Sequence, residues 1–216
     1  MAIILSTGSY CPVHRMHIET FYLCKKALEE QYGIHVVGAF ISPSHKSYVA
    51  SKLQEDFIET ETRLKLCEIS IEQAEKEHLD VSPFLSVDAW ESVECDGFVD
   101  FPEVSISLNE FIKQEFPQTP IKLIYLCGSD HINKCRYVLS FPKKLQIGVG
   151  ILQRPSHSQL SNIGKGEKDI YHIETTMQEE CSSTLVRKRA KQGESIQDLV
   201  CSDVENFMRN HHIYYQ

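Results

Sequence analysis

The chain has 216 residues, of which 42% are hydrophobic and 24% charged, and its formal net charge at pH 7 is −8. This composition is typical of a soluble globular protein, and a chain of this length can bury more than half of the surface that its unfolded form exposes. The negative charge argues against a general nucleic-acid binder, which needs a basic face, but it does not exclude a local basic pocket for a phosphorylated small molecule.

The eight cysteines have no CxxC spacing, so the sequence predicts neither a zinc ribbon nor a thioredoxin motif. The opening residues, MAIILSTGSY, lack the basic region and the long apolar run of a signal peptide. No segment approaches the ~18 apolar residues that a membrane span requires. We therefore expect free thiols, many of them buried, in a cytoplasmic protein that contacts no membrane; a eukaryotic source would also allow the nucleus.

The first half of the chain alternates between strand and helix patterns. The predicted elements are a strand at 2–5, a helix at 17–32, a strand at 35–41, a loop at 42–56 and a helix at 58–78. The second half continues less regularly. Its predicted elements are a short strand at 85–87, a loop at 95–103, a helix at 104–116, strands at 121–127 and 146–152, a loop at 155–168, an edge strand at 171–173, and helices from about 183 and about 202.

This alternation predicts parallel βαβ units and an α/β fold whose sheet is covered on both faces. Ligands of such sheets bind at the carboxyl ends of the strands. Three polar segments follow strands directly, at 8–17, 42–52 and 128–130. We expect the fold to bring them to one rim of the sheet.

The segment TGSYCPVHRMH, residues 7–17, links the first strand to the first helix. A glycine at Gly8 allows close approach of the backbone to a phosphate, and the amides of a helix start favour anions. His14 and His17 lie about one helical turn apart and share a face, so both imidazoles can donate hydrogen bonds to phosphate. Zinc binding is an alternative, but it needs a third ligand and there is no HExxH motif. A second alternative is an ordinary capped helix start that binds no ligand.

The segment CSSTLVRKR, residues 181–189, combines hydroxyl groups with an arginine at a predicted helix start. Ser182, Ser183 and Thr184 are N-cap candidates, and Arg187 follows one turn later. This arrangement suits a polyphosphate. An N-cap followed by a solvated basic face explains the same residues.

The only tryptophan, Trp90, lies in DAWESVE between Asp88 and Glu91. A tryptophan in a polar segment can stack on a flat heterocycle, most favourably on a cationic one. It can equally be a partly buried anchor.

Together these motifs resemble those of the nicotinamide/nicotinate mononucleotide adenylyltransferases, within the nucleotidylyltransferase superfamily. Residues 8–17 resemble the family's G-S-F-N-P-x-[HT]-x-x-H motif, and Arg63 falls where the family has an arginine on a helix. The other similar segments, in the family's order, are ISPSHKSY, DAWES, LCGSD and CSSTLVRKR. The sequence departs from the family pattern at four positions, Tyr10, Cys11, Ala89 and Cys181, where the family has Phe, Asn, Pro and Ile.

The resemblance implies a Rossmann-like fold in a single domain over residues 1–216, with a helical part from about 182 packed on the sheet. It also implies transfer of AMP from ATP to a pyridine mononucleotide, with Mg²⁺ accompanying ATP, without nucleic acid, membrane or a resident metal. His14, His17 and Arg187 would be catalytic. Contacts to ATP would come from Gly8, Ser9, His17, Gly128, Asp130, Ser183, Thr184 and Arg187.

Contacts to the mononucleotide, by the same resemblance, would come from Ser9, Tyr10, Lys52, Trp90 and Glu91, with Trp90 stacked on the pyridine ring. Lys46 is a second candidate for a phosphate contact. Two other functions stay open: a related nucleotidyltransferase with another phosphorylated acceptor, and a nucleotide-binding protein without turnover. The preference between nicotinamide and nicotinate, and the formation of a homo-oligomer, also stay open.

Overall fold

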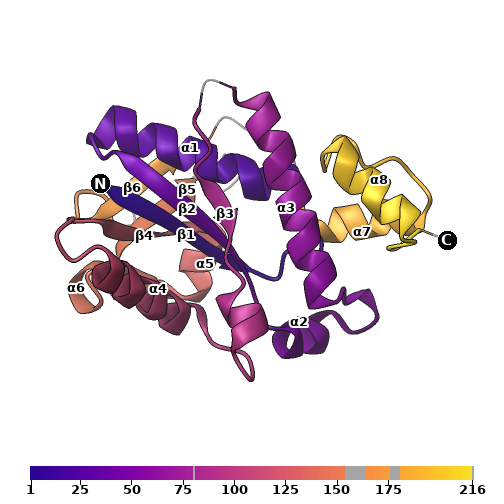
Figure 1. Ribbon diagram of the computed structural model, residues 1–216, viewed down its shortest axis with the longest axis horizontal. Helices are drawn as coiled ribbons and strands as arrows, with labels where there is room; N and C mark the ends of the chain where they lie inside the picture. Colours follow the sequence, from indigo (N-terminus) through magenta and orange to yellow (C-terminus); the bar gives the residue numbers. More distant parts are fainter. Residues whose placement is uncertain (80, 154–163, 176–180, 216) are drawn as a thin grey trace. The chain divides into compact units, whose positions relative to one another are not determined.

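The computed structural model describes residues 1–79, 81–153, 164–175 and 181–215 (Figure 1). Over these residues the strands form a six-stranded sheet with the order β3-β2-β1-β4-β5-β6. The strands are β1 (Ala2–Gly8), β2 (Val36–Pro43), β3 (Leu85–Val87), β4 (Lys122–Gly128), β5 (Gly148–Gln153) and β6 (Ile170–Glu174). The pairs β1–β4, β4–β5 and β5–β6 are parallel. This strand order is that of doubly wound, Rossmann-like sheets, so the predicted α/β fold class is confirmed.

Helices follow most of the strands. They are α1 (Arg15–Tyr32), α2 (Lys46–Leu53), α3 (Thr60–Glu77), α4 (Phe101–Glu115), α5 (Ser129–Lys134), α6 (Phe141–Lys144), α7 (Ser183–Lys191) and α8 (Ser202–Asn210). Three short turns complete the described elements: the 3-10 turns η1 (Gln54–Asp56) and η3 (Arg136–Ser140), and the π-helical turn η2 (Trp90–Glu94).

The chain divides into two compact units whose segments interleave in the sequence. Unit 1 comprises Met1–Ser6, Thr20–Phe40 and Asp100–Glu179, and unit 2 comprises Thr7–Glu19, Ile41–Val99 and Glu180–Gln216. The single domain over residues 1–216 stays a prediction.

Within unit 1, helices α1 and α4 cover opposite faces of the sheet (Figure 1). Gly150 in β5 is paired with Leu126, and a Cβ on this glycine would lie 3.5 Å from Sγ of Cys24 in α1. Phe101 of α4 stacks on Tyr125, with 5.2 Å between the ring centroids. Because neighbouring residues of a strand point to opposite faces, the α1 face carries Leu126 and the α4 face carries Tyr125.

Within unit 2, the C-terminal helices are fastened to the start of α1 and to α3. The backbone N–H of Arg15 donates to the carbonyl of Leu199 at 2.9 Å, and α8 packs against α3. The segment from about residue 182 thereby holds the N-terminus of α1, which carries His17 and directly follows His14.

The predicted loop at 42–56 is wrong, because this segment forms α2 and η1. Only Val49 of α2 is buried, so no apolar period marks the helix in the sequence. The side chain of His45 caps it by accepting from the N–H of Ser47 at 3.2 Å.

The other differences lie at element ends and in short turns. Helix α4 begins at Phe101, inside the loop predicted at 95–103, because Asp100 caps it and Pro102 occupies its first turn, where proline fits. The segment of Trp90 forms η2, and the short helices α5 and α6 had no clear signal. Residues 155–163 of the loop predicted at 155–168 lie outside the described residues. The remaining predicted strands and helices are confirmed within a few residues.

Candidate functional site

The first loop of unit 2 is closely packed around Gly8. A Cβ on this glycine would lie 3.2 Å from the ring of Tyr10, whose own backbone is left-handed at φ 40°. Tyr10 is 5% exposed, so its ring belongs to the packing of the loop. The carbonyl of Gly8 accepts from the N–H of Ser44 at 2.9 Å, which joins the ends of β1 and β2.

The two histidines of this loop lie face to face at the start of α1. The rings of His14 and His17 stack at 3.5 Å between centroids, and Nδ1 of His17 accepts from the backbone N–H of His14 at 3.2 Å. A neutral imidazole that accepts through Nδ1 carries its proton on Nε2. His17 is therefore set to donate a hydrogen bond through Nε2, as binding of a phosphate oxygen requires.

Helix α7 docks onto the same loop, so motifs about 170 residues apart in the sequence meet. Nη1 of Arg187 donates to the carbonyl of Cys11 at 2.9 Å, and Oγ of Ser183 donates to the carbonyl of Pro12 at 2.8 Å. Ser182 is the N-cap, with its Oγ accepting from the N–H of Leu185 at 3.2 Å. The structure thus brings Ser183, Arg187 and the histidine loop together within one unit.

An acidic residue that sequence analysis missed, Asp56, joins this group. Its carboxylate accepts from Nε of Arg187 at 3.1 Å and also from Nζ of Lys191. The hydrogen bond from Lys191, followed by that from Arg187, lowers the pKa of Asp56 against the opposing effect of burial. Oγ1 of Thr184 accepts from Nη2 of Arg187 at 3.3 Å, so all three guanidinium nitrogens are hydrogen-bonded. Asp56 had no signal in the sequence, because its segment reads as a loop.

Two cations converge on Ser9. Arg63 is fully buried, and its Nη1 donates to the carbonyl of Ser9 at 3.0 Å. Its other bonds go to the carbonyl of Ile58 and to Oγ1 of Thr60, and burial lowers its pKa. Lys52, from α2, donates to Oγ of Ser9 at 3.3 Å. The loop therefore carries positive charge on the side where α2 and α3 meet it, which favours an anionic ligand.

The turn that carries Trp90 is fixed to the end of β2. Oδ2 of Asp88 accepts from Oγ of Ser42 at 2.7 Å, and Oδ1 accepts from the N–H of Trp90 at 3.1 Å. The N–H of Asp88 donates to the carbonyl of Ile41 at 2.9 Å. Trp90 itself is 37% exposed, so this residue is accessible to a ligand.

Glu91 points into the protein. It is 1% exposed, and its Oε1 accepts from the backbone N–H of His45 at 2.7 Å. Burial raises the pKa of this carboxyl group to about 7. Its place inside the protein favours a structural role in the site over the direct mononucleotide contact expected from the resemblance.

Two exposed aromatic residues near Lys52 also escaped the sequence analysis. Tyr48 and Phe98 stack at 4.6 Å between centroids, and Nζ of Lys52 lies 5.5 Å from the centre of the Tyr48 ring. Both residues fall in segments that read as loops. Tyr48 ends the ISPSHKSY segment of the family resemblance, but no pattern marked either ring as a ligand contact.

Gly128 and Asp130 belong to unit 1, at the end of β4. Gly128 is the N-cap of α5, and Asp130 lies in the first turn of that helix. A Cβ on Gly128 would meet no atom within 4 Å. Their predicted contact with ATP stays a prediction.

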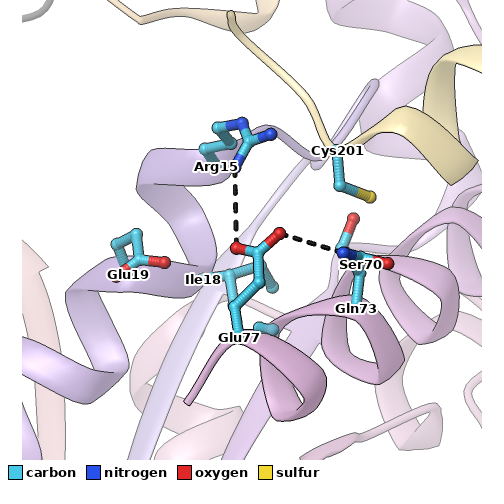
Figure 2. A pocket seen from close by; sticks show the side chains of 8 residues that line it. Arg15, Ile18, Glu19, Ser70, Gln73, Glu77 and Cys201 are labelled. Atoms are coloured by element: carbon cyan, nitrogen blue, oxygen red, sulfur yellow. Dashed lines mark hydrogen bonds and ion pairs between the residues drawn. The ribbon is translucent and has the colours of Figure 1, made fainter. Parts of the chain in front are cut away.

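Two pockets in unit 2 are poor candidates for a nucleotide site. The pocket in Figure 2 lies among α1, α3 and Cys201, where Glu77 is ion-paired with Arg15 at 3.6 Å and accepts from Nε2 of Gln73 at 3.0 Å. Its volume of about 20 Å³ holds roughly one water molecule. A second pocket, of about 530 Å³, is large enough for a ligand. Lys46, the second candidate for a phosphate contact, lines it, but so do three carboxylates, which outnumber the lysine and disfavour phosphate: Glu59, Glu61 and Asp96.

Within the described ranges, no helix is both long and apolar enough to cross a membrane. Over the same part of the chain, no group of three or more His, Cys, Asp or Glu residues is arranged to hold a metal ion.

Two curated plant proteins that are similar to nearly the whole chain carry the same name. The chain is 24% identical to the nicotinamide/nicotinic acid mononucleotide adenylyltransferase of Arabidopsis thaliana, over 98% of this chain and 89% of that protein. It is 26% identical to the protein of the same name from Oryza sativa subsp. japonica, over 99% and 86%. No family model matches the chain.

The crystal structure of a candidate nicotinate-nucleotide adenylyltransferase from Vibrio parahaemolyticus covers all of this chain, and 96% of that chain, with a TM-score of 0.52 at 14% identity. At this identity the likeness concerns the fold alone. The sequence similarity, by contrast, extends from end to end and confirms the resemblance that the motifs predict: the chain is a distant relative of the nicotinamide/nicotinic acid mononucleotide adenylyltransferases.

Proposed function

We propose that this protein transfers AMP from ATP to nicotinamide mononucleotide or nicotinate mononucleotide, giving NAD or deamido-NAD and pyrophosphate. The observation that carries the proposal is the docking of Arg187 and Ser183 on the loop of the paired histidines. These are the first and last motifs of the family resemblance. In a chain related to these adenylyltransferases along nearly its whole length, their meeting supports a common phosphate site.

The proposed reaction is a direct displacement. An oxygen of the mononucleotide 5′-phosphate attacks the α-phosphorus of ATP, the bond to the bridging oxygen of the β-phosphate breaks, and pyrophosphate leaves with the electron pair. No covalent enzyme intermediate is needed, so the work of the protein is positioning and charge stabilisation.

The residues of unit 2 suit that work. His17 donates through Nε2 to a phosphate oxygen as negative charge shifts towards the leaving group, with His14 stacked beside it. Arg187 and the hydroxyl groups at the start of α7 hold the remaining phosphates of ATP, for which Arg187 exchanges its contact with Asp56. Lys52 and Ser9 hold the acceptor phosphate, and the exposed indole of Trp90 stacks on the pyridine ring.

Magnesium enters this scheme with the substrate, as MgATP. Mg²⁺ typically keeps several water ligands and takes the others from substrate phosphates and one or two carboxylates. Asp56, whose carboxylate contacts Arg187 and Lys191, would supply such a carboxylate.

The test is pyrophosphate release by the purified protein with MgATP and nicotinamide mononucleotide, with MgATP and nicotinate mononucleotide, and with MgATP alone. We expect release that depends on a mononucleotide, and the ratio of the two rates gives the acceptor preference. Folded protein that releases pyrophosphate with neither acceptor contradicts the proposal and favours another phosphorylated acceptor or binding without turnover.

The His17→Ala variant tests the site itself. Loss of a hydrogen-bond donor to the transition state lowers kcat by roughly 10²- to 10³-fold. The control is His35→Ala, which removes an exposed histidine of unit 1 whose side chain contacts Glu29. Equal turnover of both variants would show that His17 plays no part in the chemistry.

A further inference from the structure

The exposed aromatic residues of unit 2 share a connection to one buried carboxylate. Trp90 directly precedes Glu91 in η2. Tyr48 lies in the first turn of α2, where its N–H donates to the carbonyl of His45, and the N–H of His45 donates to Glu91. The three residues Trp90, Tyr48 and Phe98 are 37%, 36% and 44% exposed.

Phe98 reaches the same carboxylate through Tyr48, on whose ring it stacks. The next residue, Val99, has a backbone N–H that lowers the pKa of Glu91. We call the Glu91 carboxyl group with its backbone donor, His45, the Glu91 clasp. It ties the turn of Trp90 to the start of α2, and each of these two segments presents a partly exposed aromatic ring.

We propose that Glu91 is a positioning residue for the acceptor ring: through the Glu91 clasp it fixes Trp90 and the stacked pair Tyr48–Phe98 in the orientation that receives a pyridine mononucleotide. This inference rests on the proposed function for the identity of the ring. The clasp itself rests on the contacts alone.

A carboxyl group offers two oxygens for this task. Its Oε1 accepts from the backbone N–H of His45, a buried residue whose donor would otherwise lack an acceptor. An amide at the same place has one acceptor oxygen, and its NH₂ group needs an acceptor of its own. Loss of one such buried bond costs more than loss of an exposed one, because the remaining group is left desolvated.

The Glu91 clasp is also connected to the residues that we propose bind the phosphate of the acceptor. Helix α2, whose N-terminus the clasp holds, also carries Lys52, which reaches Ser9 and lies near the Tyr48 ring. Glu91 therefore fixes the distance between the proposed ring contacts and a proposed phosphate contact. A ligand that binds through both ends depends on that distance.

The test uses the fact that Trp90 is the only tryptophan of the chain. Its fluorescence reports on this turn in every state of the protein, without any need for activity. In Glu91→Gln we expect a shift of the Trp90 emission to longer wavelength and stronger quenching by acrylamide. With MgATP in excess, KM for the mononucleotide should rise about tenfold, while KM for ATP stays within about twofold of wild type.

The matched control is Glu94→Gln, which changes an exposed glutamate of the same turn. It should leave emission, quenching and both KM values at wild-type levels. A Glu91→Gln variant with the same emission, quenching and KM values as wild type overturns the proposal. A rise in both KM values together, or a fall in kcat alone, also overturns it, because general loosening of the fold would produce either.

Amide exchange of the wild-type protein tests the clasp if Glu91→Gln does not fold. The amide of His45 should exchange at least about 100-fold more slowly than in an unfolded chain. Rapid exchange at this amide overturns the proposal. Failure of the proposed function looks different: no pyrophosphate is released, while the fluorescence changes and the slow exchange remain.

Discussion

At the scale of single residues, Asp56 has the clearest influence on the proposed phosphate site. It takes a contact from Arg187 and one from Lys191, so the unliganded site holds an internal anion. We expect Asp56→Asn to bind pyrophosphate about 3- to 10-fold more tightly at low salt, because the two cations lose their competing carboxylate. Isothermal titration with pyrophosphate measures this change.

The control for this prediction is Asp198→Asn. It removes the ion-pair partner of Arg189, an arginine that lies on α7 as Arg187 does. It should leave pyrophosphate affinity unchanged. Weaker binding by Asp56→Asn would mean that the carboxylate serves mainly to orient Arg187.

Glu91 should make stability depend on pH near neutrality. Burial raises its pKa from 4.5 to about 7, against the hydrogen bonds from His45 and Val99 and the charge of Arg63, while the charge of Asp88 adds to the rise. A raised pKa stabilises the fold below pH 4.5, and this contribution is lost as the pH rises towards 7. The shift corresponds to roughly 3 kcal/mol.

Urea unfolding of wild type and Glu91→Gln between pH 5 and 8 measures this dependence. The free energy of unfolding of wild type, relative to that of the variant, should fall as the pH rises from 5 to 7 and then level off. A constant difference over this range would show that the carboxyl group has an ordinary pKa.

At the scale of elements, the N-cap of α7 is the contact most open to test. Ser182 caps this nine-residue helix, which carries Ser183 and Arg187. We expect Ser182→Ala to lower the free energy of unfolding by about 1 kcal/mol, and the melting temperature by about 3 °C, because a backbone donor loses its partner. Thermal unfolding followed by circular dichroism measures the shift.

Ser202→Ala is the matched control, since Ser202 opens α8, where no side-chain hydrogen bond caps the helix. It should melt within about 1 °C of wild type. If the two variants melt at the same temperature, the cap contributes nothing measurable.

Some helices and strands could be predicted from the pattern of apolar residues, and others could not. Helix α1 and strands β1, β2 and β4 bury a continuous apolar face, and their periodicity predicted them. Helix α2 buries one residue and is held by the His45 cap and by Glu91, neither of which has a periodic signature. Tyr48 and Lys52 lie on this helix, so the ring contacts that it presents were not predicted.

At the scale of the whole molecule, burial should control the reactivity of the thiols. All eight cysteines are free, as expected, and only Cys95 and Cys135 are partly exposed. Burial raises the pKa of Cys67 and of Cys127 to about 12, so these two thiols carry little thiolate at neutral pH. We expect iodoacetamide to label at most two cysteines in the native protein and eight in urea.

Intact-mass spectrometry counts these labels, and peptide mapping identifies the sites. The melting temperature should be the same with and without a reductant, because the fold contains no disulfide to lose. Native labelling of the buried Cys24 or Cys127 would contradict the burial of the unit 1 core.

The α/β class, most strand and helix positions, and the residues that resemble family motifs could be predicted from the sequence, because apolar periodicity and short motifs are local properties of the chain. Which of those residues meet became clear only from the folded chain. It placed Arg187 and Ser183 on the histidine loop, Asp56 on Arg187, and Glu91 on the backbone N–H of His45. Such contacts join segments separated by about 45 to 175 residues, and no local pattern records which distant partner a buried polar group will find.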